Sequence, residues 1–107
     1  MREIMEFKVT PWIAENSPAK EYLLEQLEEQ ELRVYQWASP PQDNIDSHTH
    51  GYHKVLYVVE GSIKFEFPTR HETISLTPGD RLDLPAGIRH SAVVGMDGVK
   101  CLEAHIY

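Results

Sequence analysis

Cysteine, basic side chains and long apolar runs are all scarce in this 107-residue chain. A single cysteine, Cys101, excludes an intrachain disulfide and is compatible with a reducing compartment. The 10 Lys and Arg against 17 Asp and Glu argue against a nucleic-acid partner, which would favour a basic stripe. No apolar run approaches the roughly 20 residues of a membrane span, and no secretion signal is recognisable. We therefore expect a cytoplasmic protein with neither a nucleic-acid nor a membrane partner.

The length fits one domain over residues 1–107, with an arm, a helix and a first strand in 1–38 and a barrel in 39–107. An extended arm is expected over 3–9. An amphipathic helix is expected over 18–30, because Ser17 and Pro18 make a favourable helix start and apolar residues recur after them at four-residue steps.

Beyond the helix the apolar residues alternate with polar ones, which is typical of strands with one buried face. Expected strands occupy 32–38, 54–59, 62–67, 73–76, 81–84 and 99–106. Asp97 and Gly98 predict a two-residue hairpin that leads into the last strand. Short strands at this regular spacing indicate a sandwich or a closed barrel, so the expected fold class is all-β with one N-terminal helix.

Three histidines form the most informative pattern in the chain. His48 and His50 are separated by one residue, so both imidazoles point to the same side of a strand and can reach one ion. His90 follows a Pro-Ala-Gly turn over 85–87, which can deliver a third imidazole from another strand. Converging imidazoles suggest a divalent transition metal, and ligand type does not distinguish iron, nickel, zinc, manganese or copper.

The spacing around these histidines resembles the two motifs of the cupin family, over residues 42–94. The matching residues are His48, His50 and Gly61 in the first motif, and Gly79, Pro85, Gly87 and His90 in the second. Three positions depart from the pattern, with Gln42 in place of the opening Gly, Lys54 in place of the metal-binding Glu and Val94 in place of the Asn. The resemblance implies a small single-domain cupin, an antiparallel jelly-roll barrel (double-stranded β-helix) with its site in the lumen.

Lys54 is the departure that affects chemistry. In a regular strand it shares one face with Leu56 and Val58, and the resemblance makes that face the inward one. A divalent ion would repel an ammonium there, so the pKa of Lys54 falls, its side chain swings away, or an anion bridges the two cations. A one-residue bulge would instead turn His53 inward as an additional ligand. In a third alternative Lys54 reaches solvent and His53 lies on the surface.

Other polar residues are weaker candidates. Tyr52 and Tyr57 could line a pocket, although aromatic residues in barrels more often belong to the core. Arg89 could bind an anion, and the alternative is an ordinary exposed arginine. Glu103 and His105 alternate on the last strand and face either the lumen or water.

The resemblance leaves function open, because cupins include dioxygenases, isomerases, decarboxylases, storage proteins and ligand-sensing domains. We expect a metal-dependent enzyme, a dioxygenase or an isomerase, with a centre formed by His48, His50 and His90. Three neutral ligands leave the charge of the ion uncompensated, which favours an anionic small molecule. The alternative is a small-molecule-binding or sensory cupin without catalysis.

A homodimer is also expected. The arm carries an apolar strip that has no obvious place on one small barrel: Phe7, Val9, Trp12 and Ile13. Such a strip is typical of an interface between two copies of a chain.

Overall fold

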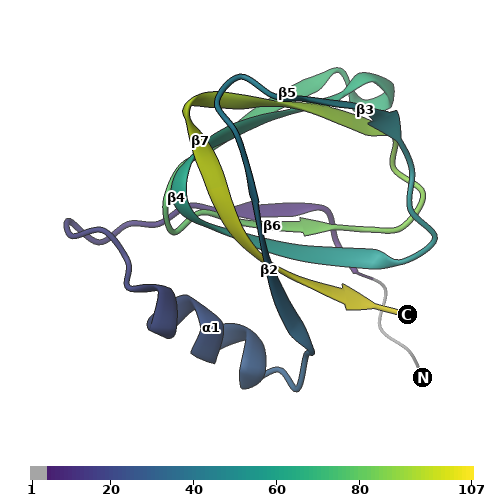
Figure 1. Ribbon diagram of the computed structural model, residues 1–107. Coiled ribbons are helices and arrows are strands. Elements are labelled where there is room, and N and C mark those ends of the chain that lie inside the picture. The colour runs from purple at the N-terminus through teal and green to yellow at the C-terminus, as the bar shows by residue number, and fades with distance from the viewer. Residues whose placement is uncertain (1–4) are drawn as a thin grey trace.

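The computed structural model describes residues 5–107 and shows an antiparallel β-barrel with one helix outside it (Figure 1). The elements in chain order are β1 (Lys8–Thr10), α1 (Lys20–Glu28), β2 (Val34–Ser39), β3 (Asn44–His48), β4 (His53–Phe67), the 3-10 helix η1 (Pro68–Arg70), β5 (Glu72–Leu76), β6 (Arg81–Leu84) and β7 (His90–Ile106). The predicted all-β class with one N-terminal helix is confirmed. Residues 3 and 4 of the expected arm lie outside the described residues.

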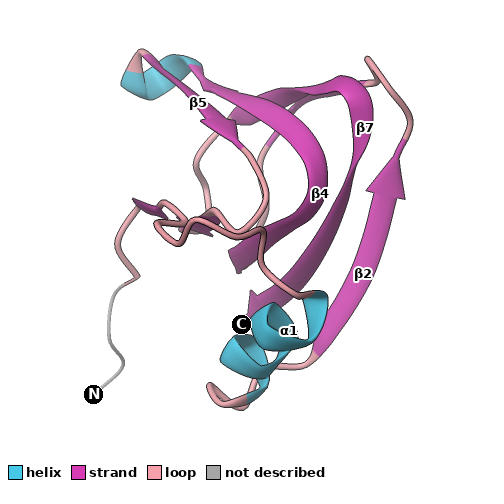
Figure 2. Cartoon of the chain, turned by 90° about the vertical axis from the view of Figure 1, so that its left-hand side faces the viewer, coloured by secondary structure: helices cyan, strands magenta, loops and turns pink. Residues whose placement is uncertain are grey.

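Two long strands, β4 and β7, hold the barrel together. The sheet runs in the order β1-β6-β4-β7-β2, while β5 pairs with the far end of β4 and β3 with the far end of β7. One layer therefore contains β1, β6, β2 and one half of each long strand, and the other contains β5, β3 and the remaining halves. Figure 2 shows β4 and β7 curving together from one layer into the other.

Glycines allow this curvature. Gly61 of β4 is the pairing partner of Val99 of β7, and the register of the ladder shifts on both sides of it. Gly61 and Gly98 both have a φ of 78°, a left-handed value that costs glycine little. The hairpin predicted at Asp97 and Gly98 is therefore wrong, because the chain bends there and continues in β7 without reversing. A left-handed glycine serves a bend inside a strand as well as a tight turn.

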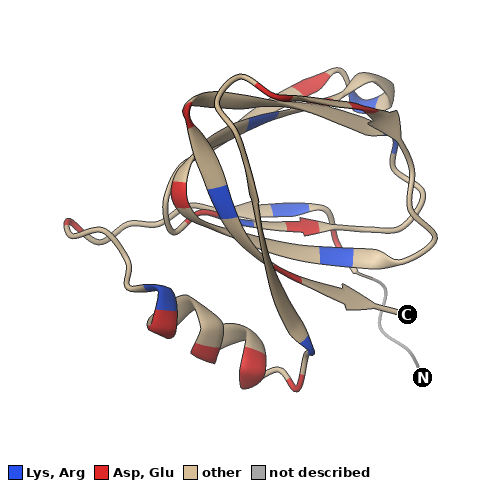
Figure 3. Ribbon diagram, in the orientation of Figure 1, with Lys and Arg blue, Asp and Glu red and all other residues tan. Residues whose placement is uncertain are grey.

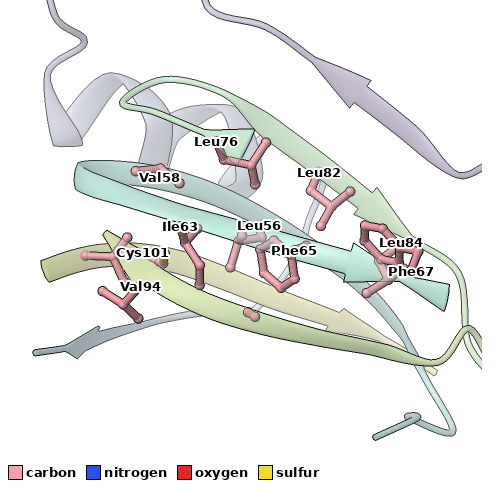
Figure 4. Packing of buried hydrophobic residues seen from close by; sticks show 12 residues of the cluster. Leu56, Val58, Ile63, Phe65, Phe67, Leu76, Leu82, Leu84, Val94 and Cys101 are labelled. Atoms are coloured by element: carbon pink, nitrogen blue, oxygen red, sulfur yellow. The ribbon is translucent and has the colours of Figure 1, made fainter. Parts of the chain in front are cut away.

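Two apolar clusters fill the structure on opposite sides of one layer. The larger cluster lies inside the barrel (Figure 4) and contains Leu56, Val58, Ile63, Phe65, Phe67, Leu76, Leu82, Leu84, Ala92, Val94, Val99 and Cys101. The smaller cluster lies between the barrel and α1 and contains Leu23, Leu27, Val55 and Leu102. Alternate residues of β4 thus belong to different clusters, as expected for a strand that is buried on both faces.

The helix is shorter than predicted. It begins after Ala19, whose backbone is extended (φ −77°, ψ 139°) and whose side chain makes no capping hydrogen bond. The predicted start at Ser17 and Pro18 is therefore wrong. The carbonyl of Ala19 accepts the first helical bonds, from the amides of Tyr22 and Leu23. Acidic residues recur along α1, which begins with a lysine, Lys20, and other Lys and Arg residues are spread over several strands and loops (Figure 3). No helix in residues 5–107 has the length and apolar character needed to cross a membrane.

The N-terminal arm packs on its own barrel. β1 pairs with β6, the Phe7 ring meets the Phe67 ring edge-on at 4.9 Å, and the Trp12 amide donates a 2.8 Å hydrogen bond to Asp80. Of the predicted apolar strip only Ile13, 92% exposed, is left without cover. The reason given for a homodimer is therefore wrong, since the strip has a place on one barrel. The homodimer itself stays a prediction.

The bend at Gly61 yields a stability test. A methyl group at position 61 would collide with the carbonyl oxygen of Gly98 and would also occupy a left-handed backbone. We expect Gly61→Ala to lower the free energy of unfolding by about 2 to 4 kcal/mol, measured by urea denaturation. Gly51→Ala is the matched control, because its methyl group would meet no atom within 4 Å. Equal stability of the two variants would contradict this account of the bend.

Candidate metal centre

Two strands and one loop bring three histidines together. His48 ends β3 and His90 begins β7, and the two residues are partners in the antiparallel pair, so their side chains share one side. His50 lies in the loop after β3, where its carbonyl accepts a 2.9 Å hydrogen bond from the amide of Gly87. This bond ties the loop to the turn before His90. The end of β3 and the starts of β4 and β7 lie at the same end of the barrel (Figure 1).

The three imidazoles present nitrogens to one another. One possible ligand atom from each ring lies within 4.8 Å of the others. The Nδ1–H of His48 donates to the carbonyl of Asp46 at 2.6 Å, and that of His90 donates to the carbonyl of Ile88 at 2.9 Å. A proton on Nδ1 leaves the lone pair on Nε2, which is the metal-binding form of the ring.

The Nε2 atoms are short of partners. Those of His48 and His50 lie 3.0 Å apart, and the buried Nε2 of His90 has no hydrogen-bond partner among the described residues. A buried nitrogen without a partner is costly unless something satisfies it. A cation shared by the three rings would do so for all of them.

Two of the three histidines have a lowered pKa, which favours the neutral ring that a metal requires. Burial, followed by the charge of Lys54, lowers the pKa of His50 to about 4. Burial also lowers the pKa of His90, against the hydrogen bond to Ile88, which raises it. Both rings are neutral at pH 7, and neutral imidazoles suit divalent transition metals. The residues therefore fit a metal ion.

Ring stacking holds His50 in place. Its ring stacks on Tyr52 with centroids 4.8 Å apart and planes 25° apart. Tyr52 stacks in turn on His105, at 3.9 Å and 29°. His48 and His90 are oriented by hydrogen bonds from Nδ1 to the backbone, whereas His50 is oriented by this column of rings.

The column ends on a buried carboxylate. Glu103 accepts hydrogen bonds from the Tyr35 hydroxyl at 2.8 Å and the Trp37 indole at 2.9 Å, and the His105 ring donates to it at 2.6 Å. The Tyr35 hydroxyl also contacts the His105 ring. Lys54 Nζ lies 3.6 Å from Glu103 Oε1. Glu103 was expected to face either the lumen or water. It is only 5% exposed, so it faces the lumen.

Lys54 lies on the inward face, as the alternation predicted. Leu56 and Val58 on the same face belong to the barrel core, whereas Val55 belongs to the cluster under α1. Lys54 is buried, so it does not reach out to solvent. Pairing between β4 and β7 continues without irregularity from His53 to Val58, so the alternative with a bulge is wrong. The ring of His53 lies apart from the three histidines and accepts a hydrogen bond from the Ala86 amide at 2.9 Å.

Two residues considered for the pocket lie elsewhere. Tyr57 faces α1, because it follows the inward Leu56 by one residue, and it accepts a 3.4 Å hydrogen bond from Arg81. Arg89 is exposed for the same reason, since its neighbour His90 points inward, and it donates to Ser47 at 3.3 Å. Sequence reasoning missed Tyr35 and Trp37, because their role depends on the pairing of β2 with β7.

Comparison with known proteins shows the fold and leaves activity open. The sequence matches no family model and no curated protein. Solved structures similar to it include an RmlC-like cupin from Shewanella frigidimarina (TM-score 0.61, 24% identity, 70% of this chain and 65% of that one). The polyketide cyclase RemF from Streptomyces resistomycificus is also similar (TM-score 0.61, 26% identity, 67% and 52%). A variant of Bacillus subtilis oxalate decarboxylase, an enzyme with Mn(II) centres, is a third (TM-score 0.61, 20% identity, 68% and 20%). The chain thus spans about half of the cyclase and a fifth of the decarboxylase.

The three-histidine cluster predicts metal binding that depends on each ring. We expect about one divalent ion per chain, and alanine at His48, His50 or His90 should weaken zinc binding more than about a hundredfold, beyond the effect of losing an outer partner. Competition with a chromogenic chelator, on protein without an affinity tag, measures this. His71→Ala is the control, because His71 lies in an exposed turn. Full metal content in a His48→Ala/His90→Ala variant would exclude the site.

The stacked column predicts that Tyr52 positions His50. Tyr52→Leu removes the ring and should weaken cobalt binding about tenfold, as loss of an outer partner does, and should broaden the visible absorption of the bound cobalt. Tyr52→Phe keeps the ring and should preserve both. If the phenylalanine variant loses as much as the leucine variant, the hydroxyl and not the stacking supports His50.

Proposed function

Because the chain has the cupin fold, with three histidines together at one end of its barrel, we propose that it is a metal-dependent enzyme acting on a small organic molecule. The observation that carries this proposal is the buried Nε2 of His90, which has no hydrogen-bond partner in the described part of the chain and lies with the other two histidine nitrogens. Without a ligand, an unpaired buried nitrogen lowers the stability of the protein. In a metal centre the same nitrogen would bind the ion.

The favoured reaction is that of a dioxygenase. A divalent ion at this centre supplies Lewis acidity and, when redox-active, electron exchange with dioxygen. Three protein ligands are the number typical of catalytic centres, in which positions stay open for substrate. Phe65 and Phe67 lie beside His90, each with its ring centroid 6.1 Å from the imidazole, and keep water from that side. The dioxygenase proposed is of the kind in which both oxygen atoms enter one substrate, which supplies all four electrons, so no separate reductant is needed.

An isomerase is the second candidate, and the pair formed by Glu103 and His105 supports it. A carboxylate that fixes one nitrogen of an imidazole leaves the other nitrogen to accept or return a proton. The His105 side chain is 15% exposed, so its ring is partly open. A non-catalytic binding protein is the remaining alternative, and it is supported by Lys54 at the position where the family carries a glutamate ligand.

The decisive assay is oxygen consumption by reconstituted protein. Metal-free protein is loaded anaerobically with ferrous iron, and in parallel with manganese, and is then mixed with air and a panel of carboxylates and thiols. We expect oxygen uptake matched by product for at least one compound. His50→Ala should abolish uptake and His71→Ala should leave it unchanged, while buffer with iron alone corrects for background oxidation.

Two other results would revise the proposal. Product without oxygen uptake would favour the isomerase. Ligand binding with neither uptake nor product under any metal would contradict the enzyme and favour the binding protein.

A further inference from the structure

Lys54 brings a positive charge to the side of the three-histidine centre. Its side chain is 11% exposed, and Glu103 is its ion-pair partner among the described residues. The separation of 3.6 Å is longer than a hydrogen bond, so the ion pair leaves the N–H groups of the ammonium available. Lys54 is joined to the centre by packing, because its pairing partner His105 stacks on Tyr52, which stacks in turn on His50.

Glu103 supplies the negative charge opposite Lys54 and leaves its N–H groups free for another partner. Burial alone would raise the pKa of Glu103, but the charge of Lys54 and hydrogen bonds from His105, Tyr35 and Trp37 lower it overall. The carboxylate thus stays ionised, and its two oxygens are already occupied by those three donors. Lys54 is therefore the member of the pair with unused hydrogen-bonding capacity.

We propose that Lys54 is the anion-binding residue of a subsite beside the metal centre, and that the ligand of this subsite is a small organic carboxylate. The inference rests on the proposed metal centre and names the class of molecule that it takes. The charges of Lys54 and Glu103 cancel and imidazole ligands carry no negative charge, so the full charge of a divalent ion remains to be balanced. A monoanion in contact with both cations balances part of it and gains charge-assisted hydrogen bonds.

A carboxylate fits these groups better than other anions do. It has two oxygens, one for the ion and one for the ammonium, and a single charge. A phosphate dianion would bring a second negative charge close to Glu103, whose own charge is buried and cannot move away. A neutral amide of the same shape would lack the charge that both cations favour.

Benzoate and benzamide form a matched pair of probes that differ in charge. Zinc-loaded protein is titrated with each by calorimetry, and metal content is measured on the same samples. We expect benzoate to bind the wild-type protein at least about tenfold more tightly than benzamide, the value of one hydrogen bond to a charged group. Lys54→Met should remove most of this preference, whereas Lys64→Met, on the exposed side of β4, should keep it.

A double variant separates the lost contact from damage to the fold. Lys54→Met leaves the buried Glu103 without its counter-charge, so Lys54→Met/Glu103→Gln restores neutrality. We expect this variant to fold and hold zinc but to bind benzoate as weakly as benzamide. Inorganic phosphate should bind every variant more weakly than benzoate binds the wild type.

The outcomes distinguish the subsite from the centre. Wild-type preference for benzoate in the zinc-loaded double variant would overturn the role of Lys54 and leave the metal centre standing. Equal binding of benzoate and benzamide by zinc-loaded wild-type protein would overturn the carboxylate. Wild-type protein that holds no metal would refute the proposed function, and the subsite would then stand only if benzoate binding still required Lys54.

Discussion

The antiparallel ladder between β4 and β7 is the constraint on which the rest of the structure depends. It runs from the pair His53 and Ile106 to the pair Glu66 and Ser91, and the other strands extend its edges. Because both strands cross between layers, the residues of the site come from both layers. His90 lies in the layer that contains β3, and Lys54 lies in the layer that contains β6. Tyr52 lies between His50 and His105 and joins the two groups.

The cluster of three histidines was predictable because most of its parts depend on local geometry. Alternation places Lys54 inward, and the left-handed Gly87, with a φ of 83°, forms the turn that leads to His90. The pairing of His48 with His90 and the bond from Gly87 to His50 require contact between distant segments. The motif spacing predicted that the histidines converge, through its resemblance to a known fold. Metal binding itself is a step beyond this geometry and rests on the buried Nε2 of His90, which has no hydrogen-bond partner among residues 5–107.

The groups around the centre could not be predicted, because distant pairing creates them. Tyr35 and Trp37 reach Glu103 across 68 and 66 positions of the chain, and nothing near them in the sequence marks them as its partners. The wrong hairpin has a related cause. The glycine at position 98 indicates a left-handed backbone there. Only the continued pairing of β7 on both sides of it shows that the chain does not reverse.

Lys54 changes how charge is distributed in the site without removing the site. Where the family pattern has a carboxylate on the ion, this chain holds its carboxylate on Glu103 and places an ammonium beside the centre. The ion then lacks a protein anion, and both cations favour an external one. An anion that contacts both would strengthen metal binding, and by thermodynamic reciprocity the metal would strengthen binding of the anion by the same factor. In the metal centre that we propose, Lys54 would thus make metal affinity depend on the bound ligand.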